Sequence, residues 1–212
     1  MLPLLLCLAL AALPAFGEQP GATLAPIAIY TQFQQEPPAA VLDALQNEVE
    51  SIMSPMGLHF EWRSLPSASG SEVSIELAVV NFKGRCDIAG LPPDSTNPGP
   101  LGWTHVSDGV ILPFADVDCE SLRGFLGKEL LKVRAAERKT SFGRALGRVL
   151  AHELYHIFAN TLRHGADGVG KPAYTVRELL STDFRFEEKE ALALKTSKAH
   201  IALQIGATPI NP

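Results

Sequence analysis

Two histidines four residues apart, with a glutamate beside the first, constrain this chain more than any other feature. The segment from Val149 to Ile157 contains His152, Glu153 and His156 in the pattern HExxH. On an α-helix this spacing places both imidazoles on one face, one turn apart. Two neutral imidazoles in that arrangement can bind one Zn²⁺, and the adjacent carboxylate can deprotonate a water molecule. The pattern therefore predicts a helix that carries a zinc site.

Apolar residues recur around this motif at helical spacing. They are Phe142, Ala145, Leu146, Val149, Leu150, Leu154, Ile157 and Phe158. Thr140 or Ser141 has the residue type of an N-cap, so we expect the helix to begin there. An ordinary core helix whose histidines form structural hydrogen bonds is the alternative. In such a helix, however, burial of the Glu153 carboxylate would cost free energy without compensation.

The start of the chain reads as an export signal. Residues 1–17 contain no charged side chain and end in small residues. Ala15 and Gly17 fit the small-x-small cleavage rule, and the run is too short for a membrane span. We therefore expect residues 18–212 to form a single domain of a secreted or periplasmic protein, with no stable membrane insertion after cleavage.

Two cysteines, Cys86 and Cys119, follow the predicted signal. An oxidising compartment favours a disulfide between them, and two buried free thiols are the alternative. The formal net charge of −5 and the absence of a basic stripe argue against nucleic acid as a partner, because the overall field repels phosphates.

Strand patterns precede the motif and short helical patterns follow it, which predicts an α+β fold. Strands are expected over 27–30, 58–63, 74–82, 101–106 and 110–115, and helices over about 41–53, 119–133 and 187–201. Ser107-Asp108-Gly109 has the residue types of a tight turn, so the last two strands form an edge hairpin. We expect a mixed, twisted sheet of about five strands packed against the long motif helix and further helices.

A catalytic zinc needs a third protein ligand. His164 lies eight residues after His156, and on a continuous helix it would be rotated by about 80° and lifted by about 12 Å. The chain must therefore leave the helix between them, and Asn160 best tolerates the left-handed conformation of such a break. Glu178 is the alternative ligand, as in thermolysin-like peptidases, although it also completes a capping box with Thr175.

The run from His152 to His164 resembles the zinc-binding segment of metzincin-type peptidases. That family shows HExxH, a break in the helix, a third histidine and a turn with Met beneath the metal. Here Ala159 and Asn160 stand at the break, and Gly168-Val169-Gly170 stands where the family has its Met. The order of elements before the motif is also similar, so the chain resembles a divergent branch of the family.

The resemblance implies a zinc-dependent metallopeptidase with one catalytic Zn²⁺ on His152, His156 and His164. Glu153 would be the general base for hydrolysis of a peptide bond. Two other classes of protein fit the same residues: a non-catalytic exported zinc-binding domain, and a zinc hydrolase of a non-peptide substrate.

The resemblance also implies where a peptide or protein substrate binds. An extended peptide would lie antiparallel to the edge strand Leu101–Val106 and pair with its main chain. Trp103 would shape a side-chain pocket, and Tyr174 would donate a hydrogen bond to the oxyanion. Each of these two aromatic residues has an ordinary packing role as its alternative.

Overall fold

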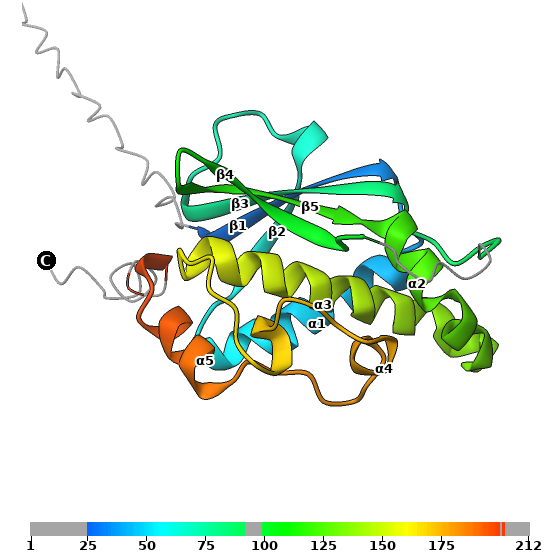
Figure 1. Cartoon of the computed structure of the whole chain (residues 1–212). Helices are drawn as coiled ribbons and strands as arrows, with labels where there is room; N and C mark the ends of the chain where they lie inside the picture. The colour runs from blue at the N-terminus through cyan, green and yellow to red at the C-terminus, as the bar shows by residue number, and fades with distance from the viewer. Residues whose placement is uncertain (1–24, 92–98, 200, 202–212) are drawn as a thin grey trace, which may run out of the picture.

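A mixed five-stranded sheet forms one layer of the molecule, and helices cover one of its faces (Figure 1). The computed structural model describes residues 25–91, 99–199 and 201, so the predicted signal peptide lies outside the described residues. The strand order is β2-β1-β3-β5-β4. All neighbouring strands are parallel except β4, which pairs antiparallel with β5 at the edge. The predicted α+β fold is confirmed.

Strands predominate in the first half of the chain, with α1 between the first two, and helices follow in the second half. The strands are β1 (Ala25–Gln35), β2 (Phe60–Ser64), β3 (Ser74–Arg85), β4 (Gly102–Ser107) and β5 (Val110–Asp118). The helices are α1 (Ala39–Met53), α2 (Cys119–Lys132), α3 (Arg138–Phe158), α4 (Val176–Leu179) and α5 (Glu188–Lys195).

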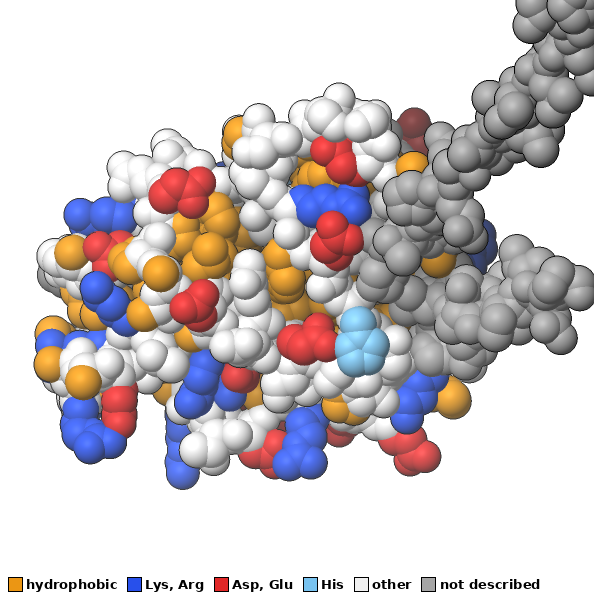
Figure 2. Space-filling view, turned by 180° about the vertical axis from the view of Figure 1, so that it is seen from behind, with side chains coloured by type: hydrophobic (Ala, Val, Ile, Leu, Met, Phe, Trp, Pro, Cys, Tyr) orange, Lys and Arg blue, Asp and Glu red, His pale blue; other side chains and the backbone are white. Residues whose placement is uncertain are grey.

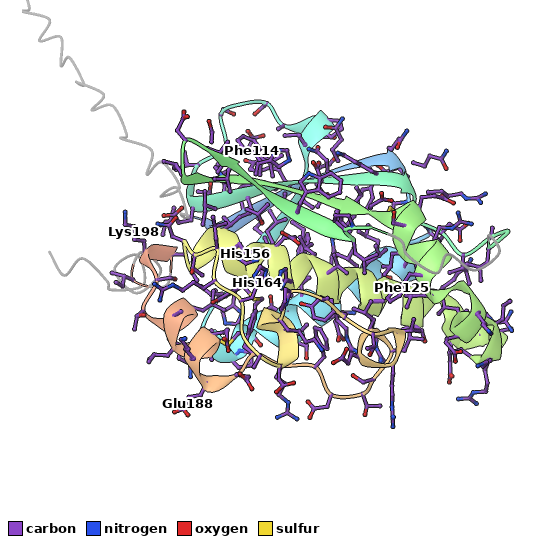
Figure 3. All side chains as sticks on the ribbon, in the orientation of Figure 1. Phe114, Phe125, His156, His164, Glu188 and Lys198 are labelled. Carbon is purple, nitrogen blue, oxygen red and sulfur yellow. A yellow bond between two sulfur atoms is a disulfide. The ribbon has the colours of Figure 1, made fainter. Side chains whose placement is uncertain are left out.

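The hydrophobic core lies between the sheet and helices α1 and α3. In β3, Ala78, Val80 and Phe82 are buried, whereas the residues between them are not, because alternate side chains of a strand point to opposite faces. Phe82 pairs with Val117 of β5, and both side chains belong to the core. Phe114 is partly exposed on the other face of the sheet, away from the helices (Figure 3).

Two helix ends differ from the predictions. α3 begins at Arg138 instead of Thr140 or Ser141, because a 3₁₀ turn at Ala135–Glu137 leads directly into it. α5 ends at Lys195 instead of near residue 201, because the N–H of Ser197 donates to the carbonyl of Leu194 at 3.1 Å, a 3₁₀-type bond in place of an α-helical one. Residues 198, 199 and 201 are helical again after this turn.

A disulfide joins Cys86, directly after β3, to Cys119, the first residue of α2, as predicted. The fully buried Arg123 strengthens the same connection. Its Nη2 donates to the carbonyl oxygens of Ala89 and Gly90, at 2.8 and 2.9 Å. The chain is therefore anchored where it leaves β3 on its way to the edge strand.

The surface carries charges of both signs. On the face shown in Figure 2, Lys and Arg side chains lie beside Asp and Glu side chains along the lower edge, and hydrophobic side chains reach the surface between them. In the described part of the chain, none of the helices is long and apolar enough to cross a bilayer.

Candidate metal centre

The long helix α3 presents His152 and His156 one turn apart on the face that lines a cleft. Both side chains are buried. Their Nε2 atoms lie 3.0 Å apart, and the rings meet edge to face. A tetrahedral zinc with Zn–N bonds of about 2.0–2.1 Å requires ligand nitrogens about 3.3 Å apart, so this pair fits one ion with a small adjustment.

The chain leaves the helix at Asn160, as predicted. Asn160 has a positive φ of 48°, and its N–H donates to the carbonyl of Ile157 at 3.3 Å. The next residue, Thr161, donates from its N–H to the carbonyl of His156 at 3.2 Å. These two bonds define a Schellman motif, which ends the helix and reverses the direction of the chain. The reversal returns His164 toward the two helical histidines.

His164 completes a group of three imidazoles. Its ring centroid lies 5.2 Å from that of His152 and 4.8 Å from that of His156. One nitrogen from each ring can be chosen such that all three lie within 4.8 Å of one another. Figure 3 shows His156 and His164 beside each other below the sheet. His164 is exposed, whereas the other two rings are buried, so the group opens to solvent on one side.

Backbone carbonyls determine which nitrogens of the helical histidines carry a proton. Nδ1 of His152 lies 2.8 Å from the carbonyl oxygen of Val169, and Nδ1 of His156 lies 2.7 Å from that of Thr161. Because a carbonyl oxygen can only accept, both Nδ1 atoms donate, and the neutral rings direct Nε2 lone pairs at each other. A cation between the two nitrogens relieves this repulsion. The donor set therefore fits a metal ion.

The electrostatic environment keeps these rings in the form that binds metal. The pKa of His152 is lowered to about 4, mainly by burial and to a smaller extent by the neighbouring His156 and His164, against the opposing effect of the Val169 carbonyl. Burial also lowers the pKa of His156. Both imidazoles are accordingly neutral at pH 7, with an unprotonated nitrogen available as a ligand.

Glu153 is buried beside the same group, and the edge strand β4 contacts its carboxylate. The hydroxyl of Thr104 lies 2.8 Å from Oε2. At Gly102 an added Cβ would lie 2.9 Å from Oε1 and 2.9 Å from Cγ1 of Val149, so only glycine permits this approach of strand and helix. Burial raises the pKa of Glu153 to about 7, although the hydrogen bond from Thr104 acts in the opposite direction.

A cleft of about 700 Å³ opens in front of these residues. The three histidines, Glu153 and β4 form part of its lining. The remaining lining is mostly apolar and includes Leu101, Phe125, Val149, Leu162, Pro172 and Tyr174. Phe125 comes from α2, further along the groove from the histidines (Figure 3). The cleft can therefore accommodate an extended chain with apolar side chains.

Both aromatic residues that the sequence predicted for substrate binding line the cleft. The ring of Trp103 lies under the Lys83 ammonium group, 4.2 Å from its centroid. The hydroxyl of Tyr174 donates to the carbonyl of Val169 and lies 2.9 Å from Nδ1 of His152. This hydroxyl is therefore on the side of the His152 ring away from the metal-binding nitrogen.

Glu178, the alternative third ligand, has a different position. Among the described residues, the group that could hold a metal comprises three histidines and does not include it. Its carboxylate accepts hydrogen bonds from Lys171 and from the backbone N–H of Thr175, which lower its pKa to about 2. The predicted capping box with Thr175 is confirmed.

A glycine-rich loop carries the carbonyl that holds His152. The 3₁₀ turn Gly168–Gly170 contains the fully buried Val169. The N–H of Gly165 donates to the carbonyl of Gly170 at 2.7 Å, and the buried Glu190 of α5 packs against both glycines. An added Cβ at Gly165 would lie 2.5 Å from Oε1 of Glu190, so a larger residue there would have to displace the Glu190 carboxylate.

Sequence reasoning did not identify Thr104, Gly102 or the carbonyls of Val169 and Thr161 as parts of the site. Strand alternation could have indicated Thr104, because it follows Trp103 in the predicted edge strand and its side chain must lie on the opposite face of the sheet. The carbonyl groups leave no signature in residue types.

Comparison with known proteins gives no match, either to a protein-family model or to a curated protein. The possible metal site therefore depends on the geometry of the three histidines in this fold, without a family assignment.

Proposed function

We propose that this protein is an exported zinc-dependent metallopeptidase. The observation that carries the proposal is the convergence of three imidazoles in a cleft, with the carboxylate of Glu153 adjoining them. A purely structural zinc site has no use for such a carboxylate, and most structural sites have four protein ligands instead of three.

His152, His156 and His164 would hold the ion, with Val169 and Thr161 orienting the first two rings from behind. A zinc ion held there supplies Lewis acidity that activates a water molecule and polarises a carbonyl group. The exposed side of the group, at His164, is where the substrate would approach.

Glu153 would act as general base and then as general acid. Thr104 occupies its Oε2, which leaves Oε1 to accept the proton of the attacking water. The same carboxyl group then delivers that proton to the amine nitrogen as the peptide bond breaks. The proton thus passes from water to the leaving group, and the hydroxyl of the water joins the acyl carbon.

The edge strand supports a peptide as the substrate. The carbonyl of Leu101 accepts from the N–H of Asp118 at 2.9 Å, so the main-chain groups of Leu101 point toward β5. Because these directions alternate in an antiparallel pair, the main-chain groups of Gly102 and Thr104 point to the free edge. An extended peptide can pair with them in the cleft.

The order of elements also resembles that of metzincin-type peptidases, with a strand, a helix, two strands and an edge hairpin before the zinc helix, although here α2 stands between the hairpin and that helix. The turn at Val169 lies where that family has its Met-containing turn. In this chain its carbonyl holds the first histidine. Export is supported by the signal-like residues 1–17 and by the disulfide, which forms in oxidising compartments.

The test is hydrolysis of a broad peptide library by the purified, zinc-loaded protein and by Glu153→Ala. We expect the variant to keep its zinc and to lose about 10²–10⁴-fold in kcat, the usual contribution of a general acid–base group. If the wild-type protein retains zinc but hydrolyses neither peptides nor other substrates, a non-catalytic zinc domain is favoured. If it cleaves non-peptide esters or amides but no peptide, a zinc hydrolase of another substrate is favoured.

A further inference from the structure

We infer that Thr104 positions the carboxylate of Glu153, and that one residue of the edge strand therefore serves both substrate pairing and general-base orientation. The inference rests on the proposed function. It assigns to Thr104 a positioning role that acts through Glu153.

Thr104 reaches Glu153 from a distant part of the chain. The two residues are 49 positions apart, yet the Thr104 hydroxyl lies 2.8 Å from Oε2 and 3.2 Å from the backbone carbonyl oxygen of Glu153. A threonine hydroxyl has one proton to donate and can rotate between these two acceptors. Both contacts tie β4 to the same residue of α3.

Gly102 restricts the carboxylate from the other side. The close approach of the Gly102 backbone to Oε1 and to Val149 leaves little room for Glu153 to change rotamer. With Oε2 bonded to Thr104, the carboxylate can turn Oε1 only within this narrow space. The strand thus selects which oxygen is available for proton transfer.

The main chain of the same strand segment faces outward. Gly102 and Thr104 direct their N–H and C=O groups to the free edge, whereas their neighbours bond to β5. A peptide that pairs with Thr104 therefore pairs with the residue that holds the base. A shift of the strand on substrate binding would move the carboxylate together with the bound peptide.

The outer face of the sheet holds this strand in place. His105 follows Thr104 and points the opposite way, where its Nε2 lies 2.7 Å from Oδ2 of the buried Asp116. Lys83 of β3 lies 3.1 Å from the same oxygen. Because consecutive residues of β4 are bonded on both faces, Thr104 has a defined position relative to α3.

Three variants of the full-length zinc-loaded protein test the inference. Thr104→Val removes the hydroxyl at nearly constant shape, Thr104→Ser keeps it, and Thr31→Val removes a hydroxyl from β1 of the same sheet. We expect kcat for a peptide substrate to fall about tenfold or more in Thr104→Val with KM nearly unchanged, because misdirection of a general base affects the chemical step. Thr104→Ser should restore most of kcat, and Thr31→Val should match the wild-type value. A wild-type kcat in Thr104→Val, or equal losses in the Val and Ser variants, would overturn the inference.

A second readout does not depend on hydrolysis. In urea unfolding, Thr104→Val should lower the midpoint more in the wild-type background than in the Glu153→Ala background, where only the 3.2 Å contact of the hydroxyl with the backbone carbonyl of residue 153 remains. Equal shifts in both backgrounds would contradict the contact on which the inference depends. The wild-type protein could cleave no peptide while the effect of Thr104→Val on the urea midpoint still differs between the two backgrounds. In that case the proposed function fails, and the contact between strand and helix stands.

Discussion

The backbone carbonyl of Val169 lies 2.8 Å from Nδ1 of His152, although the two residues are 17 positions apart in the chain. This hydrogen bond assigns the proton of His152 to Nδ1 and directs Nε2 into the cleft. The carbonyl belongs to the 3₁₀ turn Gly168–Gly170. This turn therefore orients a candidate metal ligand through its main chain.

Tyr174→Phe tests this arrangement. The Tyr174 hydroxyl contacts both the Val169 carbonyl and Nδ1 of His152, so its removal should loosen the turn and the ring. We expect zinc affinity to fall about tenfold, at the lower end of the range for partners of metal ligands. Competition with a chromophoric chelator measures this change. Unchanged zinc affinity in Tyr174→Phe would contradict a role of this hydroxyl in orienting His152.

Gly102→Ala should damage the site without unfolding the protein. The new methyl group would meet Oε1 of Glu153 and Cγ1 of Val149, so either the strand or the carboxylate must move. We expect a loss of about 1–3 kcal/mol in unfolding free energy, as for other overpacked sites, together with reduced kcat. Ser107→Ala, at an exposed position of the same strand, is the control. Wild-type activity and stability in Gly102→Ala would show that the Gly102 backbone is not in tight contact with Glu153 and Val149.

The sequence predicted those parts of the site that depend on local spacing. His152 and His156 share a helical face because of their four-residue separation, and Asn160 ends the helix because it tolerates positive φ. Once the helix ends there, His164 can return to the other two rings. The capping box likewise accounts for the position of Glu178.

Parts of the site that depend on tertiary packing could not be read from the sequence. The contact between Thr104 and Glu153 joins a strand to a helix 49 residues away, and it requires the register of β4 on β5 to be known. The predicted start of α3 at Thr140 or Ser141 is wrong for a related reason, since the helix begins at Arg138. Arg138 donates from Nε and Nη2 to the carbonyls of Val133 and Leu131, each at 2.9 Å, a contact that no periodicity indicates.

Reduction of the disulfide should lower stability strongly. Cys86 and Cys119 are 33 positions apart, and the chain-entropy model gives about 3–4 kcal/mol for a loop of that length. Thermal unfolding with and without a thiol reductant measures the difference, and the double variant Cys86→Ser/Cys119→Ser should unfold like the reduced protein. Identical unfolding temperatures under both conditions would argue against the bridge.

Asp116 should make stability depend on pH in the acid range. Burial alone raises the pKa of this carboxyl, but hydrogen bonds from His105, Lys83 and Asn81 outweigh it and hold the pKa below the ordinary 3.8. A depressed pKa stabilises the fold above the unfolded value, and this stability is lost as pH falls through the folded value. Asp116→Asn should therefore flatten the dependence of urea unfolding on pH below about 4. Asp108→Asn, in the exposed hairpin turn, should leave it unchanged.

The metal content of His164→Ala, compared with wild type and Glu178→Ala, tests the central claim most directly. We predict about one zinc per chain in the wild-type protein and in Glu178→Ala, as expected for a three-ligand site on the histidines. In His164→Ala, zinc affinity should fall by more than the roughly 10–100-fold that loss of a ligand's hydrogen-bond partner causes. Full zinc retention in His164→Ala, with loss in Glu178→Ala, would contradict the three-histidine site.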